Sequence, residues 1–418
     1  MRWHGGGATI LQRLARLPDV LPGPAAALAR DHRPRLLTSI EGPLRTAFSG
    51  TTWYFAEAAL AHGVIDAAIA MTTGSNRRNN RIYATAAAWK ATRILRRRKF
   101  GGYKFHPQFH DVLWSQYSRS VAESTVINQF QLYGPHFRSH HEQLGIVPYF
   151  HIDGTLREYF STYLTADDPL ITSIGDDVRR RAIDEEQAGY TIARGIIAMS
   201  RATQRCLRED YGVAPGRIAF IMPGANLPDD AVLPPSPHSG WLGDAFTVGF
   251  VGFYPLRKGL RTLAQAVRIL RERRVPIRLR VIGRCPDDVA AMDGVDYLGT
   301  INKATDTARF VEAIRGVDLG CQLSRAELVG IAMLEFLRVG VPFLATDIGG
   351  MPDVAAGGGG VIVSPSISAE ELADTLSGLM NDTARYQALR DAAKARTRWA
   401  SWQRAACEMR QVLDRLGP

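Results

Sequence analysis

The sequence predicts an α/β protein built from two Rossmann-like domains that face each other across a cleft. Short apolar runs alternate with segments of helical periodicity from residue 35 onward, which is the pattern of parallel sheets covered by helices. A Pro- and Ser-rich stretch at 234–240 interrupts the alternation, which restarts after it. The 418 residues are enough for two or three domains, each with its own core. Ligands of such sheets bind beyond the carboxyl ends of the strands.

The first half of the chain supplies the elements of one sheet. Residues 35–40 predict its first strand, and a loop that ends at Gly50 leads into a helix over 53–61. Further short apolar runs predict strands at 66–71, 124–129, 147–152 and 195–200.

The second half repeats the alternation. Its predicted strands lie at 247–251, 278–282, 318–322, 342–346 and 360–363. Its predicted helices lie at 259–273, 307–315, 331–338 and 369–380, and a terminal helical pattern runs up to Leu416.

Prolines and small polar residues at 234–240 continue neither a strand nor a helix, so we place a domain boundary there. The chain then divides into an N-terminal extension, a first Rossmann-like domain, a linker, a second Rossmann-like domain and a C-terminal helix. These parts are 1–34, 35–235, 236–244, 245–395 and 396–418.

The composition is that of an ordinary globular protein, with 46% hydrophobic and 22% charged residues. Its four cysteines are far apart and form no Cys-x-x-Cys pair, which argues against a disulfide framework and a zinc site. We therefore expect a reducing, cytoplasmic location. Residues 1–17 lack an apolar run of the length of a signal peptide, so we expect none there. The most apolar later stretch, 51–71, contains Glu57, His62 and Asp66, so we expect no membrane span.

The formal net charge of +10 is confined to one segment, because residues 77–104 contain ten basic residues and no acidic one. The basic residues are Arg77, Arg78, Arg81, Lys90, Arg93, Arg96, Arg97, Arg98, Lys99 and Lys104. Apolar side chains interrupt the cations in the helix-compatible stretch 89–100. Such a segment can bind an anionic membrane surface. The alternatives are a solvated helix face and a nucleic-acid contact, although no nucleic-acid-binding motif accompanies the segment.

Two glutamates flank a predicted helix start in the second half. If the helix begins near Gly330, its free N–H groups and positive dipole end would hold a phosphate. Glu335 would then lie about 6 Å along the helix axis, and Glu327 would lie on the other side of the phosphate. The alternative is that Glu327 is a solvated loop residue and Glu335 a surface helix residue.

A basic pair opens an earlier helix. Arg257 and Lys258 follow the strand 247–251 and a loop that starts at Gly252. Arginine gives bidentate contacts to a phosphate and lysine a point charge, a combination that suits a diphosphate. Two positive charges near the positive end of a helix dipole are electrostatically unfavourable. This unfavourable placement indicates that the pair has a function. The alternative is a solvated face.

In combination these motifs resemble those of retaining glycosyltransferases of family 4, which have the GT-B fold. The resemblance covers nearly the whole chain and is closest over 246–402. It rests on four motifs: Gly252 with Arg257-Lys258-Gly259, Val281-Ile-Gly283, Glu327-x-x-Gly330 with Glu335, and the segment from Pro342 to Asp353.

The resemblance implies a donor site in the second domain for a nucleotide-diphosphate sugar. Arg257 and Lys258 would bind the diphosphate, Glu335 the nucleotide ribose, and Glu327 the hydroxyls of the transferred sugar. The N–H groups of Gly330 and Ile331 would complete the phosphate cradle. The family transfers a sugar with retention at the anomeric carbon, through a same-face substitution in which the leaving diphosphate helps to deprotonate the acceptor.

The resemblance also assigns parts of the first domain and the end of the chain. Gly50 would belong to the family's glycine loop near the donor phosphates. The alternative is that it forms a simple strand-to-helix turn. His151, at the end of a strand, would face the donor sugar or be structural, and Asp153 is a site residue or a turn former. The terminal helix would cross back onto the first domain, where Trp399 and Trp402 would pack in the core.

The implied acceptor is a glycan or a lipid-linked molecule of cell-envelope or exopolysaccharide synthesis. Because the resemblance implies such acceptors, we favour peripheral membrane binding for the basic segment 77–104. No Asp-x-Asp triplet occurs, so we expect two cations in place of a divalent metal, no metal site and no cofactor. A noncatalytic scaffold that binds nucleotide sugars and a nucleic-acid-binding protein remain alternatives. The donor base, the donor sugar and the oligomeric state have no signature in the sequence.

Overall fold

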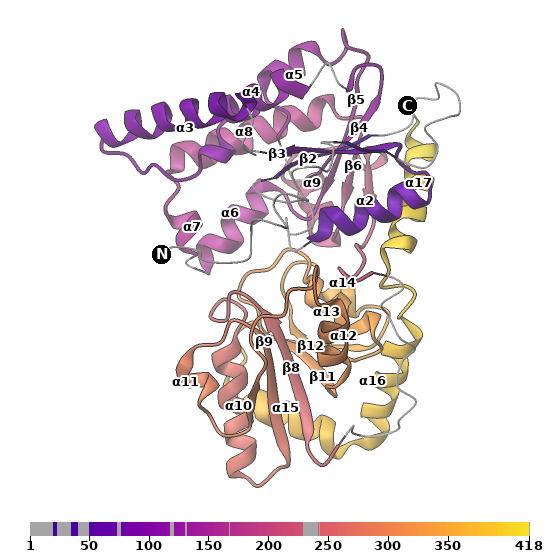
Figure 1. Ribbon diagram of the computed structural model, residues 1–418. Helices are drawn as coiled ribbons and strands as arrows, with labels where there is room; N and C mark the ends of the chain where they lie inside the picture. The colour runs from indigo at the N-terminus through magenta and orange to yellow at the C-terminus, as the bar shows by residue number, and fades with distance from the viewer. Residues whose placement is uncertain are drawn as a thin grey trace.

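The computed structural model describes residues 20–22, 35–40, 50–72, 77–117, 121–129, 132–166, 168–228, 241 and 243–417. Most of the expected N-terminal extension and residues 236–240 and 242 of the expected linker lie outside the described residues. The two predicted sheets are present, one above the other in Figure 1. Among the residues described, no helix combines the length and the apolarity that crossing a bilayer requires.

The first sheet has seven strands in the order β1-β3-β2-β4-β5-β6-β7. All neighbours are parallel except β1, which is antiparallel to β3. The strands are β1 (Val20–Pro22), β2 (Arg35–Ile40), β3 (Ala67–Thr72), β4 (Thr125–Gln129), β5 (Val147–Ile152), β6 (Gly195–Ala198) and β7 (Ile218–Phe220). The five predicted strands of this half are β2 to β6.

Eight helices accompany this sheet among the described residues: α2 (Thr51–Ala61), α3 (Arg77–Leu95), α4 (Pro107–Tyr117), α5 (Pro135–His140), α6 (Leu156–Thr165), α7 (Pro169–Thr172), α8 (Asp176–Ile192) and α9 (Arg201–Glu209). Two predictions need correction. Strand β6 ends at Ala198 rather than 200, because the Ser200 hydroxyl accepts the Thr203 N–H and caps α9. The stretch 89–100 is not one helix, since α3 ends at Leu95 and Arg97 has a positive φ of 51°.

The second sheet has six parallel strands in the order β10-β9-β8-β11-β12-β13. They are β8 (Phe246–Gly252), β9 (Ile277–Gly283), β10 (Val295–Tyr297), β11 (Leu319–Gln322), β12 (Phe343–Thr346) and β13 (Gly360–Val363). The helices of this half are α10 (Leu260–Glu272), α11 (Asp287–Ala290), α12 (Thr307–Arg315), α13 (Ile331–Arg338), α14 (Met351–Ala355), α15 (Ala369–Asn381) and α16 (Thr383–Ala395).

Both faces of each sheet are buried, which explains why the strands read as continuous apolar runs. On β4, Val126 packs into one core and the next residue, Ile127, into the core on the other face. On β9, Val281 and Ile282 divide in the same way between the two cores of the second sheet.

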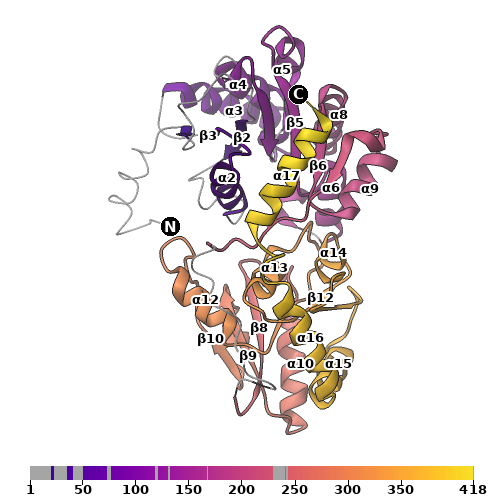
Figure 2. The ribbon, with the colours of Figure 1, turned by 90° about the vertical axis from the view of Figure 1, so that its right-hand side faces the viewer.

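The terminal helix α17 (Trp402–Leu416) crosses back onto the first sheet and packs against α2, as predicted (Figure 2). Trp402 begins it and is buried beside Phe55 of α2, with ring centroids 5.8 Å apart. The Trp402 indole donates to Asn226 Oδ1 over 3.0 Å, and Asn226 Nδ2 donates to the Thr51 hydroxyl over 3.0 Å. The end of the chain thereby ties the second domain to the first.

Candidate active site

The loop after β8 carries the predicted basic pair. Gly252 lies against the side chain of Lys258, since a Cβ atom there would lie 2.7 Å from Cδ of the lysine. Gly259, which caps α10 with a φ of 72°, packs against the backbone of Leu323 after β11. The loops after two neighbouring strands therefore meet at the carboxyl edge of the second sheet.

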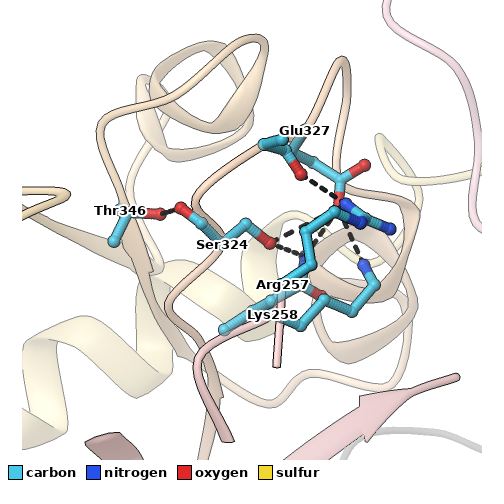
Figure 3. A network of polar contacts seen from close by, with 7 residues as sticks. Arg257, Lys258, Ser324, Glu327 and Thr346 are labelled. Carbon is cyan, nitrogen blue, oxygen red and sulfur yellow. Dashed lines mark hydrogen bonds and ion pairs between the residues drawn. The ribbon is translucent and has the colours of Figure 1, made fainter. Parts of the chain in front are cut away.

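Glu327 is the centre of a polar network at this edge (Figure 3). Its Oε2 accepts from Lys258 Nζ at 2.7 Å and from Gln322 Nε2 at 2.9 Å, and Nη1 of Arg257 lies 3.7 Å away. Ser324, whose carbonyl accepts the Thr346 hydroxyl, supports the same loop. The side chain of Glu327 is only 14% exposed, so the alternative of a solvated loop residue is wrong.

The electrostatics of this network keep Glu327 ionised. Burial alone would raise the pKa of its carboxyl, but the charges of Lys258 and Arg257 and the hydrogen bond from Lys258 lower the pKa below its ordinary value. The two basic side chains are themselves 13% and 14% exposed. The solvated-face alternative for this pair is therefore also wrong.

Arg257 lies where the two domains meet. Its guanidinium group donates to the carbonyl of Ala326 and lies over the rings of Tyr254 and Tyr163, at 5.2 Å and 5.1 Å from the centroids. Tyr163 belongs to α6 of the first domain. A cation of the second domain is thus held by an aromatic side chain of the first, a pairing that no local sequence pattern predicts.

Helix α13 begins where the glutamate spacing predicted. Gly330 is its N-cap with a φ of 89°, and no side chain of the described residues caps the helix start. The N–H groups of Ile331 and Ala332 have no acceptor within the helix and point beyond its start, whereas the N–H of Met333 donates to the carbonyl of Gly330 over 3.0 Å. These groups and the positive end of the helix dipole favour an anion there.

Glu335 lies on the second turn of α13 and is 2% exposed, so the alternative of a surface helix residue is wrong. Its Oε1 accepts from Nζ of Lys303, a residue of the loop that follows β10. Burial raises the pKa of Glu335 above its ordinary value, and the charge of Lys303 offsets part of this rise. Sequence reasoning missed Lys303, because it is far from the motifs along the chain.

On the first-domain side, Gly50 is the buried N-cap of α2 with a φ of 92°. His151, on β5, is 1% exposed and packs on Phe55 with ring centroids 4.6 Å apart. Its Nδ1 lies 3.3 Å from Nε2 of Gln129, and its Nε2 has no hydrogen-bond partner among the described residues. Burial lowers the pKa of His151 to about 3, so the ring is neutral. These contacts fit a structural role, and the site role of His151 remains a prediction.

Asp153 lies in the loop after β5, opposite Glu327. Burial, reinforced by the negative charges of Glu327 and Glu158, raises the pKa of Asp153 to about 7. The adjacent Gly154 packs against Leu328, since a Cβ atom there would lie 2.7 Å from Cδ2 of the leucine. The loop after β5 and the glutamate loop of the second domain are therefore in contact across the interface.

Comparisons with known proteins agree with this arrangement. Residues 245–382 match the family model described as glycosyl transferases group 1. A D-inositol 3-phosphate glycosyltransferase of Corynebacterium aurimucosum is 26% identical over 285 residues, which are 64% of this chain and 66% of that protein. Relatives of the same name from Corynebacterium urealyticum and Xylanimonas cellulosilytica are matched over 52% and 59% of their length. The chain thus spans less than two thirds of these relatives.

Two solved structures show the same architecture over most of the chain. The sucrose-phosphate synthase of Thermosynechococcus elongatus has a TM-score of 0.65 at 18% identity and covers 92% of this chain and 99% of its own. Anabaena HepE in complex with UDP-glucose has a TM-score of 0.59 at 15% identity, with 91% and 99% covered. The chain therefore has the GT-B fold of these proteins, and its residues 245–382 match the model of the glycosyl transferases group 1 family.

Proposed function

We propose that this protein is a glycosyltransferase that moves a sugar from a nucleotide-diphosphate sugar to a hydroxyl acceptor, with retention at the anomeric carbon. The observation that carries the proposal is the placement of Arg257, Lys258 and Glu327 beside the uncapped start of α13, with Glu335 on the same helix. Two cations and a helix start suit a diphosphate, and each glutamate suits a set of sugar hydroxyls. The UDP-glucose bound to the structurally similar HepE supports a donor of this class.

Catalysis in this proposal is electrostatic. The bond between the anomeric carbon and the diphosphate oxygen breaks while the acceptor oxygen bonds to the same face of that carbon. The acceptor proton passes to the leaving diphosphate, so no protein base is needed. Arg257 and Lys258 stabilise the negative charge that develops on the diphosphate, and Glu327 holds the sugar hydroxyls. Donor binding thus replaces part of the pairing that the cations now make with Glu327.

We propose a glycan or lipid-linked acceptor of cell-envelope or exopolysaccharide synthesis. The D-inositol 3-phosphate glycosyltransferases among the relatives indicate, by their name, an acceptor with several hydroxyls. A cytoplasmic location is supported by the four cysteines, all of which are free thiols in the structure.

The direct test is the release of nucleoside diphosphate from a panel of UDP-, GDP- and ADP-sugars, with and without added polyol and glycan acceptors. We expect turnover with at least one donor. The variants Lys258→Ala and Glu327→Gln should each lower kcat/KM by about 10²-fold or more, because each removes a charge that faces the reacting groups. Arg261→Ala is the matched control, since Arg261 pairs with the exposed Asp288 rather than with Glu327. Donor binding without any turnover would show a noncatalytic scaffold instead.

We also propose that transfer is independent of metal ions. The positive charges of Arg257 and Lys258 supply the neutralisation that a divalent cation gives in other phosphate sites. Treatment with EDTA should leave the rate unchanged. A loss of activity that only magnesium or manganese restores would contradict the assigned roles of the two cations.

A further inference from the structure

Four of the large hydrophobic side chains that are exposed on the described part of the chain belong to two adjoining segments of the first domain, the end of α3 with the loop after it and α7. They are Ile94, Leu95, Phe100 and Leu170, with exposed fractions of 56%, 84%, 49% and 50%. The first two end α3, and Leu170 belongs to α7. A bridge between Gly101 and Ile174 joins the two segments. Exposed leucine and isoleucine at one place indicate a surface that meets another apolar body.

The structure divides the basic run of this region into two groups. Arg93 is 8% exposed and forms a two-bonded ion pair with Asp177 over 2.8 and 3.0 Å, so it holds α3 against α8. Lys99 donates to the carbonyl of Thr172 over 2.6 Å and fastens the loop to α7. These two cations are structural, which corrects the expectation that the whole run faces a partner.

The second group of cations is exposed beside the apolar side chains. Lys90, Arg96 and Arg97 are exposed, and among the described residues none of the three has an acidic partner. Lys90 lies 5.5 Å from the ring centroid of Phe100, so positive charge and apolar surface are interleaved. We define the apolar-basic surface by these three cations and by Ile94, Leu95, Phe100 and Leu170.

We propose that the apolar-basic surface docks the first domain on a bilayer that contains anionic lipids. Its exposed cations are attracted to the anionic headgroups, and the aliphatic and aromatic side chains between them can enter the boundary of the acyl region. A nucleic acid would use the cations and the ring of Phe100 but leave the aliphatic side chains unused, since leucine and isoleucine make neither phosphate contacts nor base stacking. Charge complementarity together with exposed aliphatic side chains therefore favours the bilayer.

This docking would bring the cleft close to the lipid surface. The loop after α6 leads directly into α7, which carries Leu170, and α6 carries Tyr163, whose ring lies over Arg257 of the candidate active site. An acceptor held in the bilayer could thus be presented from the side of α6 and α7. The inference does not rest on the proposed function, because binding to vesicles is measured without turnover.

The test is co-sedimentation of the full chain with vesicles of phosphatidylcholine alone or with phosphatidylglycerol, at a physiological salt concentration of about 150 mM. We expect binding only to the anionic vesicles. Arg96→Glu with Arg97→Glu should weaken it by about tenfold or more. Ile94→Ser with Leu95→Ser should also weaken it, although the charge is unchanged. Arg274→Glu with Arg278→Glu, two exposed arginines of the second domain, is the matched control and should bind like the wild type.

Each variant is checked by its Tm, because the altered side chains are exposed and should leave the fold intact. Absence of the wild type from the anionic vesicle pellet would overturn the proposal. So would full binding by the Ile94→Ser, Leu95→Ser variant. The surface would be a nucleic-acid contact if the Ile94→Ser, Leu95→Ser variant still bound single-stranded RNA while the Arg96→Glu, Arg97→Glu variant no longer did.

Discussion

Glu327 keeps two cations together where their repulsion would otherwise separate them. Lys258 and Arg257 both face its carboxylate, at 2.7 Å and 3.7 Å, in a place that is largely closed to water. Removing one partner of a buried pair leaves an uncompensated charge, which costs more than the pair contributes. The site is thus organised before any ligand binds, and the same carboxylate is available for sugar hydroxyls.

Lys303 is predicted to tune the ionisation of Glu335. The pKa of Glu335 is raised by burial, so removing the charge of Lys303 should raise it further. In Lys303→Met the carboxylate would become protonated at a higher pH, and the acid limb of nucleotide affinity should move upward in pH. At the acid end of the pH range we expect Lys303→Met to bind nucleotide about tenfold more weakly than the wild type. Titration calorimetry at a series of pH values measures this difference.

Two comparisons make this prediction specific. Lys303→Arg should restore the wild-type pH profile, because it keeps the charge. Lys394→Met should leave the profile unchanged, since Lys394 has the same exposed fraction of 22% but pairs with Asp391 on α16. An unchanged profile in Lys303→Met would refute the role assigned to the ion pair.

Asp153 should make the stability of the protein fall as the pH rises. Its pKa of about 7 in the folded protein exceeds the ordinary value, so the folded state binds a proton that the unfolded state has lost. This stability is present below the ordinary carboxyl pKa and is lost as the pH rises to about 7. The Tm of Asp153→Asn minus the Tm of the wild type should therefore be larger at pH 8 than at pH 5. The exposed Asp414→Asn is the control, and an equal Tm difference at both pH values would disprove the effect.

The start of α13 depends on one backbone conformation. Gly330 has a φ of 89°, which disfavours any other residue, and a Cβ atom there would collide with the sulfur of Met351. Gly330→Ala should lower the free energy of unfolding by about 1–3 kcal/mol and weaken nucleotide binding, because the N–H groups would be displaced.

A glycine elsewhere gives the matched control for this helix start. Gly378 lies inside α15, and a Cβ atom added there would meet no atom of the described residues within 4 Å. Gly378→Ala should therefore raise the free energy of unfolding by about 0.5–1 kcal/mol. Urea unfolding of both variants measures the contrast. If Gly330→Ala left the free energy of unfolding unchanged, the helix start would tolerate a side chain.

The sequence predicted the strands of four or more residues and missed those of three, and it made no prediction for the long helices α8 and α16. Strands β7 and β10 lie at the edges of their sheets and have three residues each, too few for a recognisable pattern. The end of α3 was missed, because no proline or glycine stands at Leu95, and the helix is followed instead by Arg97 with a positive φ.

For the candidate site, residues close in the sequence were predicted and their distant partners were not. The spacing from Glu327 through Gly330 to Glu335 placed both carboxylates around one helix start. The partners Lys303 and Tyr163 come from other elements, and only the folded chain brings them to the site. Local patterns carry no information about such pairs.

The two domains are held together at several places beside the site. The carboxylate of Asp353 on α14 accepts the N–H of Arg201 at the start of α9 over 2.7 Å, and α17 crosses from the second domain to the first. The candidate site lies between these ties, with Arg257 of one domain against Tyr163 of the other. Residues of both domains therefore shape the space above the cations.

Arg257, Lys258 and the start of α13 are proposed to grip a diphosphate together, and every other role assigned to the site depends on this grip. Titration calorimetry of UDP, GDP and ADP, each beside its nucleoside, measures it directly. We predict that at least one diphosphate binds much more tightly than its nucleoside, and that this difference disappears in the Arg257→Ala, Lys258→Ala double variant while Arg261→Ala keeps it. Binding of no diphosphate, or a difference that survives in the double variant, would show that these groups do not form the diphosphate site.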